Sequence, residues 1–167
     1  MSQTISLCIP CFPRDTHKLY ICLKSIMLEK IQPYDLVIAH SEMTNQEASQ
    51  LRQKLYLEFN PNFNITIAND EKKHYAAGNR NRGVKFCTGD YISFIDADDT
   101  SNSNRIQKIS DIINKYQPIC IVHSFSKPNR TDVFKYLFDL VKPNQRTLFT
   151  GNEIYYYAFL NKRTKSK

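Results

Sequence analysis

The chain has 167 residues, of which 41% are hydrophobic and 12% aromatic. This length and composition exclude an intrinsically disordered chain and fit one folded domain with a hydrophobic core. No apolar run approaches the roughly 18–20 residues that a membrane-spanning helix needs, so we expect no transmembrane segment. The net charge of +7 does not indicate nucleic-acid binding, because four of the basic residues lie in the last six positions.

We expect a single domain over residues 1–160 and a basic tail over residues 161–167. The N-terminus has no basic region ahead of a long apolar stretch, so we expect no signal peptide and a cytoplasmic protein. The tail contains Lys162 and Arg163 followed by two more lysines. Such a cluster can contact anionic lipid head groups, so a peripheral position at a membrane surface is a second expectation.

Short apolar runs alternate along the chain with segments whose apolar residues recur at helical spacing. This alternation predicts an α/β fold with a mostly parallel sheet and helices on both faces. The expected strands are residues 5–9, 35–39, 63–68, 91–95 and 119–122. The expected helices are residues 16–27, 44–59, 75–86, 103–116 and 131–141. Residues 154–160 fit either a strand or a helix.

The predicted strand at residues 91–95 is followed by three carboxylates, Asp96, Asp98 and Asp99. Carboxylates are costly to bury unpaired, so they should lie at the exposed carboxyl end of the strand, where open α/β sheets bind ligands. Mg2+ and Mn2+ prefer carboxylate oxygens and are often shared with a substrate phosphate. The pattern predicts a site for a metal ion and a diphosphate. The alternative is an acidic turn that caps the next helix.

The helix that precedes this strand carries Arg80 among small residues such as Gly78 and Gly83. A guanidinium can donate two hydrogen bonds to a phosphate or to a carboxylate. We therefore expect Arg80 to contact a ligand phosphate or one of the three aspartates, and the two roles are compatible. Arg82 is expected to face solvent.

Two segments, Arg80-Asn81-Arg82-Gly83 and residues 89–99, together resemble the nucleotide-sugar half of the family 2 glycosyltransferases, which have the GT-A fold. The pattern of that family is roughly Ala/Gly-Arg-Asn-x-Gly, then Gly-Asp-Tyr-Ile, then Phe-x-Asp-x-Asp-Asp. The resemblance covers about residues 4–125. It implies a Rossmann-like GT-A fold and a chain that is a short family member or the donor-binding portion of one.

The resemblance implies a metal-dependent, inverting glycosyltransferase that uses Mn2+ or Mg2+. It would move a sugar from a nucleotide diphosphate sugar, with a UDP-sugar favoured and a GDP-sugar as the alternative, to a hydroxyl of a glycan, lipid or protein. The implied metal ligands are Asp98 first, then Asp96 and Asp99. The implied nucleotide-sugar contacts are Pro10, Phe12, Arg14, Glu42, Arg80, Asp96, Ala97 and Asp98.

The chain departs from the family after the second predicted strand. The family usually has paired acids there, and the first of them holds the base, whereas this chain has His40, Ser41 and Glu42. Glu42 and Ser41 are the candidates to replace that acid, and His40 either contacts the base or ends the strand. The general base of the family lies well past the aspartates. No clear motif for it follows here, and the weak candidates are Asp132, Asp139 and Glu153.

Two other classes of function stay open. Only 68 residues follow Asp99, so the chain can be a non-catalytic nucleotide-sugar-binding module or a fragment. Cys8 and Cys11 form a Cys-x-x-Cys pattern, which is also found in redox pairs and zinc sites. The other three cysteines are scattered singly, so reduced cysteines in the core are the expected role.

Overall fold

A computed structural model of the chain describes residues 3–118, 120–122, 147–149 and 159–162, with side chains over residues 3–118. Among the described helices, none has both the length and the apolar character needed to cross a membrane. Several predictions fall outside these residues and stay predictions: the helix at 131–141, Asp132, Asp139, Glu153 and most of the basic tail.

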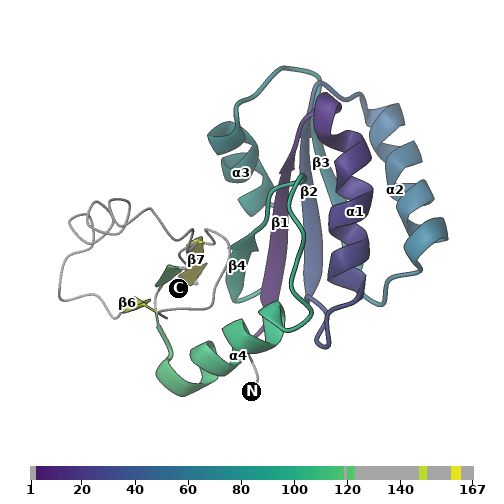
Figure 1. Cartoon of the computed structure of the whole chain (residues 1–167). Coiled ribbons are helices and arrows are strands. Elements are labelled where there is room, and N and C mark those ends of the chain that lie inside the picture. The colour runs from purple at the N-terminus through teal and green to yellow at the C-terminus, as the bar shows by residue number, and fades with distance from the viewer. Residues whose placement is uncertain (1–2, 119, 123–146, 150–158, 163–167) are drawn as a thin grey trace, which may run out of the picture.

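Four parallel strands lie side by side in the order β3-β2-β1-β4 (Figure 1). They are β1 (Ile5–Cys11), β2 (Asp35–Ser41), β3 (Asn64–Asp70) and β4 (Tyr91–Phe94). Each matches a predicted strand, and β1, β2 and β3 extend past the predicted ends. Because parallel strands point the same way, the loops that follow them meet at one side of the sheet, here called the carboxyl edge.

Three short strands extend the sheet beyond β4 in the order β7-β5-β6. They are β5 (Cys120–Val122), β6 (Thr147–Phe149) and β7 (Phe159–Lys162). β7 is antiparallel to both β4 and β5, whereas β5 and β6 are parallel. The sheet is therefore mixed at this side and parallel over β1–β4, the part that forms the carboxyl edge.

Helices cover both faces of the sheet, as predicted. Figure 1 shows α1 and α2 together on the face that is turned to the viewer, with α3 on the other side of β1. The helical elements are the 3-10 helix η1 (Pro13–Asp15) and the α-helices α1 (Thr16–Met27), α2 (Asn45–Phe59), α3 (Ala76–Val84) and α4 (Arg105–Tyr116). Helix α2 begins with a capping box, in which the Thr44 hydroxyl accepts from the Glu47 backbone N–H.

Side-chain alternation along the strands produces the two cores. On β1, Leu7 and Ile9 belong to the larger cluster with residues of α1, α2 and α4, whereas Cys8 belongs to a smaller cluster on the α3 side. Helix α4 buries Ile106, Ile109 and Ile113 in the larger cluster. Tyr116 is 42% exposed, because it is the last residue of α4 and lies beyond the core.

Residues 95–104, here called the acidic segment, connect β4 to α4. The segment leaves the carboxyl edge and passes in front of β1 to the opposite end of the sheet, where α4 begins (Figure 1). The predicted acidic residues lie in its first half, so their positions depend on what holds this long connection in place.

Candidate functional site

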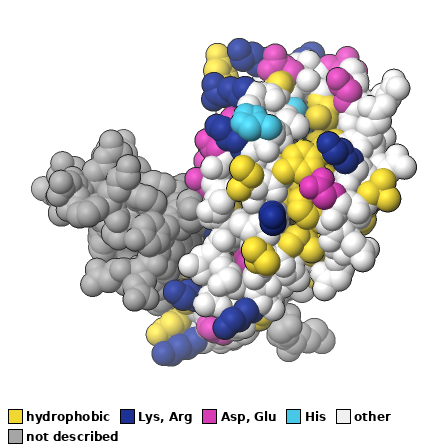
Figure 2. Space-filling model, turned by 45° about the vertical axis from the view of Figure 1, so that its right-hand side comes forward, with side chains coloured by type: hydrophobic (Ala, Val, Ile, Leu, Met, Phe, Trp, Pro, Cys, Tyr) yellow, Lys and Arg dark blue, Asp and Glu magenta, His cyan; other side chains and the backbone are white. Residues whose placement is uncertain are grey.

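The carboxyl edge gathers the loops that follow β1, β2, β3 and β4. Strand register places Cys11 beside His40 and Ser41 beside Asp70, so these strands end at the same level. Figure 2 shows basic and acidic side chains gathered at this upper end of the molecule. Seven predicted ligand contacts belong to these strand ends and loops: Pro10, Phe12, Arg14, Glu42, Asp96, Ala97 and Asp98.

Arg80 connects α3 to the acidic segment. Its NH2 atom lies 2.5 Å from Asp96 Oδ1, which confirms the expected pairing with one of the three aspartates. The two side chains are 34% and 46% exposed, so both remain open to a ligand. The pair therefore places a guanidinium and a carboxylate together at the carboxyl edge.

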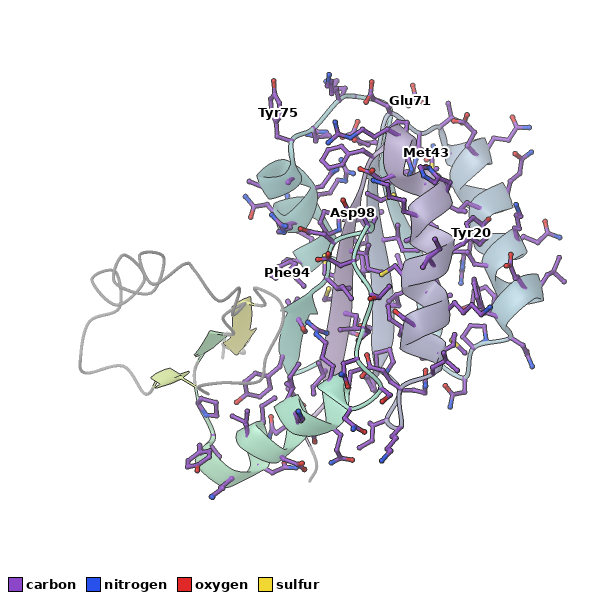
Figure 3. All side chains as sticks on the ribbon, viewed as in Figure 1. Tyr20, Met43, Glu71, Tyr75, Phe94 and Asp98 are labelled. Carbon is purple, nitrogen blue, oxygen red and sulfur yellow. The ribbon has the colours of Figure 1, made fainter. Side chains whose placement is uncertain are left out.

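Lys18 of α1 is a site residue that the sequence analysis missed. Its Nζ lies 3.1 Å from Asp15 Oδ1 and 3.8 Å from Asp98 Oδ2. Burial acts to raise the pKa of Asp15, but the hydrogen bonds from Lys18 and Arg14 outweigh it and lower that pKa. In Figure 3, Asp98 lies between α1 and α3, so a second cation approaches the acidic segment from the side opposite to Arg80.

Asp99 lies in a tight turn with Asp96 and Asp98. Its backbone N–H donates to the Asp96 carbonyl at 3.0 Å, which closes a tight turn. Burial raises the pKa of Asp99, and the negative charges of Asp96 and Asp98 raise it further. The turn therefore concentrates negative charge that a cation or a donor group can relieve.

Asn79 fixes the orientation of α3. Its fully buried amide donates to the Cys11 carbonyl at 3.1 Å and to Ser41 Oγ at 3.4 Å. These bonds tie the first turn of α3 to the ends of β1 and β2. The neighbouring Arg80 is thereby held at the carboxyl edge.

Arg82, predicted to face solvent, is mostly buried, with a side chain that is 15% exposed. Its Nε donates to the Ala68 carbonyl at 3.2 Å and its NH2 to Asn79 Oδ1 at 3.0 Å. Its NH1 also lies 3.7 Å from Asp70 Oδ2. The prediction was wrong because the carbonyl and carboxylate at the end of β3 offer acceptors beneath α3.

The residues after β2 are divided between core and surface. His40 is 2% exposed, with Nε2 2.9 Å from Thr16 Oγ1 and Nδ1 2.8 Å from the Ser41 carbonyl. Burial lowers the pKa of His40, which favours a neutral, structural histidine. Ser41 is also buried, whereas Glu42 is exposed in a left-handed conformation with φ of 55°. Of these three, only Glu42 presents its side chain to the outside.

Comparison of the chain with known protein families identifies the family to which it belongs. The profile of the family described as glycosyl transferase family 2 matches residues 6–165. The chain belongs to glycosyl transferase family 2. The resemblance of the Arg80 helix and the acidic segment to this family is thereby confirmed.

Two curated relatives of this family 2 chain are glycosyltransferases. The amylovoran biosynthesis glycosyltransferase AmsB of Erwinia amylovora is 25% identical over 114 residues, or 68% of this chain. Glycosyltransferase GlyG of Streptococcus pneumoniae serotype 4 is 20% identical over 133 residues, or 79% of this chain. The matched parts are 37% of AmsB and 42% of GlyG. The chain thus spans less than half the length of either relative.

Solved structures of glycosyltransferases share the fold. The mannosyltransferase PcManGT from Pyrobaculum calidifontis, in complex with GDP-Man and Mn2+, superposes with a TM-score of 0.62 and 16% identity over 82% of this chain and 39% of its own. S. aureus TarS 1-349 in complex with UDP-GlcNAc gives 0.57 and 16% over 76% and 36%. The expected GT-A fold is therefore confirmed.

The glycines of the family pattern have packing roles. A Cβ on Gly83 would lie 2.5 Å from Cys8 Sγ, and a Cβ on Gly89 would lie 2.8 Å from the Ser6 backbone nitrogen. Gly83 lets α3 approach the sheet, and Gly89 lets the chain enter β4 against β1. Both support the site without contacting it.

A divalent metal is compatible with the donor set of this family 2 chain. Mg2+ is usually held by one or two carboxylates, with substrate phosphates and water completing its coordination. Asp96 and Asp98 offer half-exposed carboxylates, with side chains 46% and 53% exposed. No group of three or more His, Cys, Asp or Glu side chains with metal-binding geometry occurs in the part of the chain that the structure describes. The residues thus fit an ion that is shared with a diphosphate.

Asp70 and His74 form a pair at the rim of the carboxyl edge. His74 Nε2 lies 2.9 Å from Asp70 Oδ2, and the Lys72 backbone N–H donates to Asp70 Oδ1 at 2.9 Å. The bond from Lys72 and then the bond from His74 lower the pKa of Asp70. A charged acceptor therefore stands at the end of β3, next to the end of β2.

The four cysteines whose side chains the structure describes, Cys8, Cys11, Cys22 and Cys87, are buried, as expected. Cys8 and Cys11 are three residues apart in β1, so they face opposite sides of the sheet and belong to different clusters. A hydrogen bond with Cys87 and burial raise the pKa of Cys8, and burial raises the pKa of Cys11 to about 12. This placement argues against a shared disulfide or zinc ion for the pair.

Proposed function

We propose that this chain is the donor-binding part of a glycosyltransferase and that it holds a nucleotide diphosphate sugar at the carboxyl edge. The observation that carries the proposal is the ion pair between Arg80 and Asp96, which joins two sequence motifs at the edge where such sheets bind ligands. The solved relatives with UDP-GlcNAc and GDP-Man support a nucleotide-sugar ligand. A UDP-sugar is favoured, and a GDP-sugar is the alternative.

Each proposed contact follows from its place in the fold. Pro10 near the end of β1, Phe12 directly after the strand and Arg14 in η1 hold the nucleotide from one side. Glu42 takes the role of the base-binding acid, because Ser41 is buried and Glu42 is exposed. In the acidic segment, Asp96 would face the ribose or the outer shell of the metal, and Ala97, which is buried, would contribute a contact to the nucleotide sugar beside it.

The chemistry that this arrangement supports is departure of a diphosphate from the anomeric carbon of a sugar. Arg80 and Lys18 can offset the negative charge that develops on the leaving group, because fixed charges in place before the reaction need no reorganisation. Asp98, with Asp96 and Asp99 as further candidates, would hold Mn2+ or Mg2+. When bound, the ion would supply Lewis-acid stabilisation of the diphosphate.

An acceptor hydroxyl of a glycan, lipid or protein would attack the anomeric carbon from the face opposite the diphosphate, with inversion. The attack requires a general base. The candidates Asp132, Asp139 and Glu153 lie outside the described residues and stay part of the proposal, as does a cytoplasmic location next to a membrane surface.

A binding module is the second candidate function, because the matched parts are only 37% of AmsB and 42% of GlyG. The positioning of two reactants contributes roughly 7–11 kcal/mol of a barrier. A chain without an acceptor-binding part should therefore hydrolyse a donor slowly and transfer sugar poorly. A screen of nucleotide sugars for hydrolysis, followed by an acceptor screen, separates the two functions: fast transfer to a simple acceptor contradicts the binding-module function.

Calorimetric titration of UDP and GDP, with and without Mn2+, tests the proposed site. Asp98→Asn should abolish the gain in affinity that Mn2+ gives. Asp111→Asn is the matched control, because Asp111 is an exposed acid on α4 that accepts from Gln107 at 2.8 Å. Equal affinities with and without metal, or equal losses in the two variants, would contradict the metal assignment.

A further inference from the structure

Glu29, just beyond the end of α1, is a buried acid that no part of the proposed reaction uses. It is 5% exposed, and both of its carboxylate oxygens are engaged. Oε2 accepts from the Ile106 backbone N–H at 2.7 Å, and Oε1 accepts from the Ser101 hydroxyl. Glu29 therefore contacts both the end of the acidic segment and the first turn of α4, 77 residues further along the chain.

The segment at residues 95–104 is attached along one side of α1. The Cys22 thiol donates to the Asp96 carbonyl at 3.7 Å, and the Ser101 backbone N–H donates to Ser25 Oγ at 2.7 Å. Just beyond the helix, the Lys30 N–H donates to the Ser103 carbonyl at 2.9 Å. Positions 22 and 25 share one face of α1, and Glu29 and Lys30 follow shortly after the helix. This side of α1 and the residues just beyond it therefore align the segment from its first aspartate to its end.

Arg105 holds the other side of the same junction. Its NH2 atom donates to Ser93 Oγ at 2.6 Å and to the Phe94 carbonyl at 2.9 Å, so it fixes the end of β4. Glu29 fixes the next residue, Ile106. Together the two side chains fix both ends of the connection that carries the aspartates.

A local side chain would be enough to cap α4. Asn104 stands at the N-cap position, where asparagine is a favoured capping residue, yet its side chain makes no capping hydrogen bond within the described part of the chain. The backbone N–H of Ile106 is bonded instead by the buried carboxylate of Glu29, just beyond the end of α1. Burying an ionised group is costly unless its bonds are specific. This arrangement couples α1 to the acidic segment.

We propose that Glu29 is a positioning residue for the donor site: through Ser101 and Ile106 it fixes residues 95–104, so that Asp96 and Asp98 stand beside Arg80 and Lys18. The inference rests on the proposed function in assigning a ligand to these aspartates. The mechanical part, that Glu29 fixes the segment, does not depend on the identity of any ligand.

Two variants of Glu29 separate positioning from bulk stability. Glu29→Gln keeps an oxygen to accept from Ile106 and an amide to donate to Ser101, whereas Glu29→Ala loses both bonds. Ser101→Ala is a milder second variant in case Glu29→Ala does not fold. Glu58→Ala is the matched control, because Glu58 is an exposed acid on α2.

Hydrogen exchange of the wild type and the variants measures the mechanical part. In Glu29→Ala, and to a smaller degree in Ser101→Ala, the amides of Asp99, Ser101 and Ile106 should exchange about tenfold faster or more, since hydrogen bonds to charged groups are strong. Amides of β1, β2 and β3 should keep their protection, and Glu29→Gln should behave as wild type. Unchanged exchange over residues 95–106, or faster exchange throughout the chain, would overturn the proposal.

Titration of UDP in the presence of Mn2+ measures the functional part. Affinity should fall about tenfold in Glu29→Ala, recover in Glu29→Gln and stay unchanged in Glu58→Ala. Faster exchange with unchanged affinity would show that Glu29 is only structural and would overturn the positioning role. A wild type that binds no nucleotide overturns the proposed function, and the exchange measurement still decides whether Glu29 fixes the segment.

Discussion

Arg80 NH2 and Asp96 Oδ1 meet at 2.5 Å between α3 and the segment that follows β4. The two residues come from the two motifs that resemble the family, and the fold brings them together across 16 positions of sequence. Asn79 holds the helix end of this contact through its bonds to Cys11 and Ser41. The contact is therefore a fixed feature of the carboxyl edge.

The first prediction concerns this guanidinium. Arg80→Ala should weaken UDP binding by about 10–100-fold, because a charge-assisted hydrogen bond contributes about 1.5–3 kcal/mol. Arg52→Ala is the control, since Arg52 is exposed on α2 and bonds only weakly to Asn64 at 3.4 Å. Calorimetry checks both variants, and equal affinities in Arg80→Ala and Arg52→Ala would contradict a diphosphate contact.

The second prediction concerns Lys18, which lies 3.8 Å from Asp98. Lys18→Met should tighten Mn2+ binding in the absence of nucleotide by about fivefold or more, because a nearby unit charge contributes about 1 kcal/mol even in water. The same variant should weaken UDP binding without metal, because a cation at the diphosphate is lost. Lys24→Met, an exposed lysine of the same helix, is the control. Unchanged Mn2+ affinity in Lys18→Met would contradict the inference that Lys18 and the metal ion compete for Asp98.

The local sequence pattern was enough to predict the elements of the fold that local spacing of apolar and polar residues determines. The strands β1–β4, the helices α1–α4 and the acidic turn all follow from periodicity and from the position of carboxylates after a buried strand. Lys18, Asn79 and Glu29 were missed because their contacts join residues far apart, as in the bond from Asn79 to Cys11 across 68 positions.

Arg82 and β7 are two further cases in which contacts between distant parts of the chain could not be predicted from the local sequence. A charged residue on a short helix was expected in solvent, but the Ala68 carbonyl and Asp70 lie beneath it. The antiparallel β7 pairs with β4 and β5 from the end of the chain, and nothing in the local sequence specifies such a partner.

The third prediction concerns pH. Burial raises the pKa of Glu29 above its ordinary value of 4.5, although the bonds from Ser101 and Ile106 oppose the shift. The folded state then binds this proton more tightly than the unfolded state, so the free energy of unfolding falls as pH rises from the ordinary pKa through the raised one. Glu29→Gln lacks this titration.

The stability of Glu29→Gln relative to wild type should therefore increase with pH across that window and stay level above it. Denaturant unfolding of both proteins over roughly pH 4 to 8 measures the difference. A difference that is constant with pH, or that decreases, would show that Glu29 does not have a raised pKa in the folded protein.

The fourth prediction concerns the thiols. Burial raises the pKa of Cys11 and of Cys22 to about 12, so only about one thiol in ten thousand is ionised at pH 8, and the thiolate is the reactive form. Iodoacetamide should leave Cys8, Cys11 and Cys22 unmodified in the native protein and label them in denaturant, as read by peptide mass spectrometry. Rapid native labelling of Cys11, or a disulfide between Cys8 and Cys11, would favour a redox function.

The last prediction uses two glycines of the same helix. A Cβ at Gly83 would meet Cys8 Sγ at 2.5 Å and Ala39 Cβ at 3.1 Å, whereas a Cβ at Gly78 meets nothing closer than 3.5 Å. Alanine in a helix is favoured over glycine by about 1 kcal/mol, so Gly78→Ala should be neutral or stabilising. Gly83→Ala gains the same propensity but overpacks the core between α3 and the sheet, which typically costs about 1–3 kcal/mol.

Denaturant unfolding should therefore rank Gly78→Ala above Gly83→Ala in stability. Because Cys8 is part of the obstruction, Cys8→Ala should recover part of the loss when it is combined with Gly83→Ala, and the double-mutant cycle measures this coupling. Gly83→Ala with the stability of Gly78→Ala would mean that α3 can move away from β1. In that case UDP binding should weaken in Gly83→Ala, because the same movement would carry Arg80 away from Asp96.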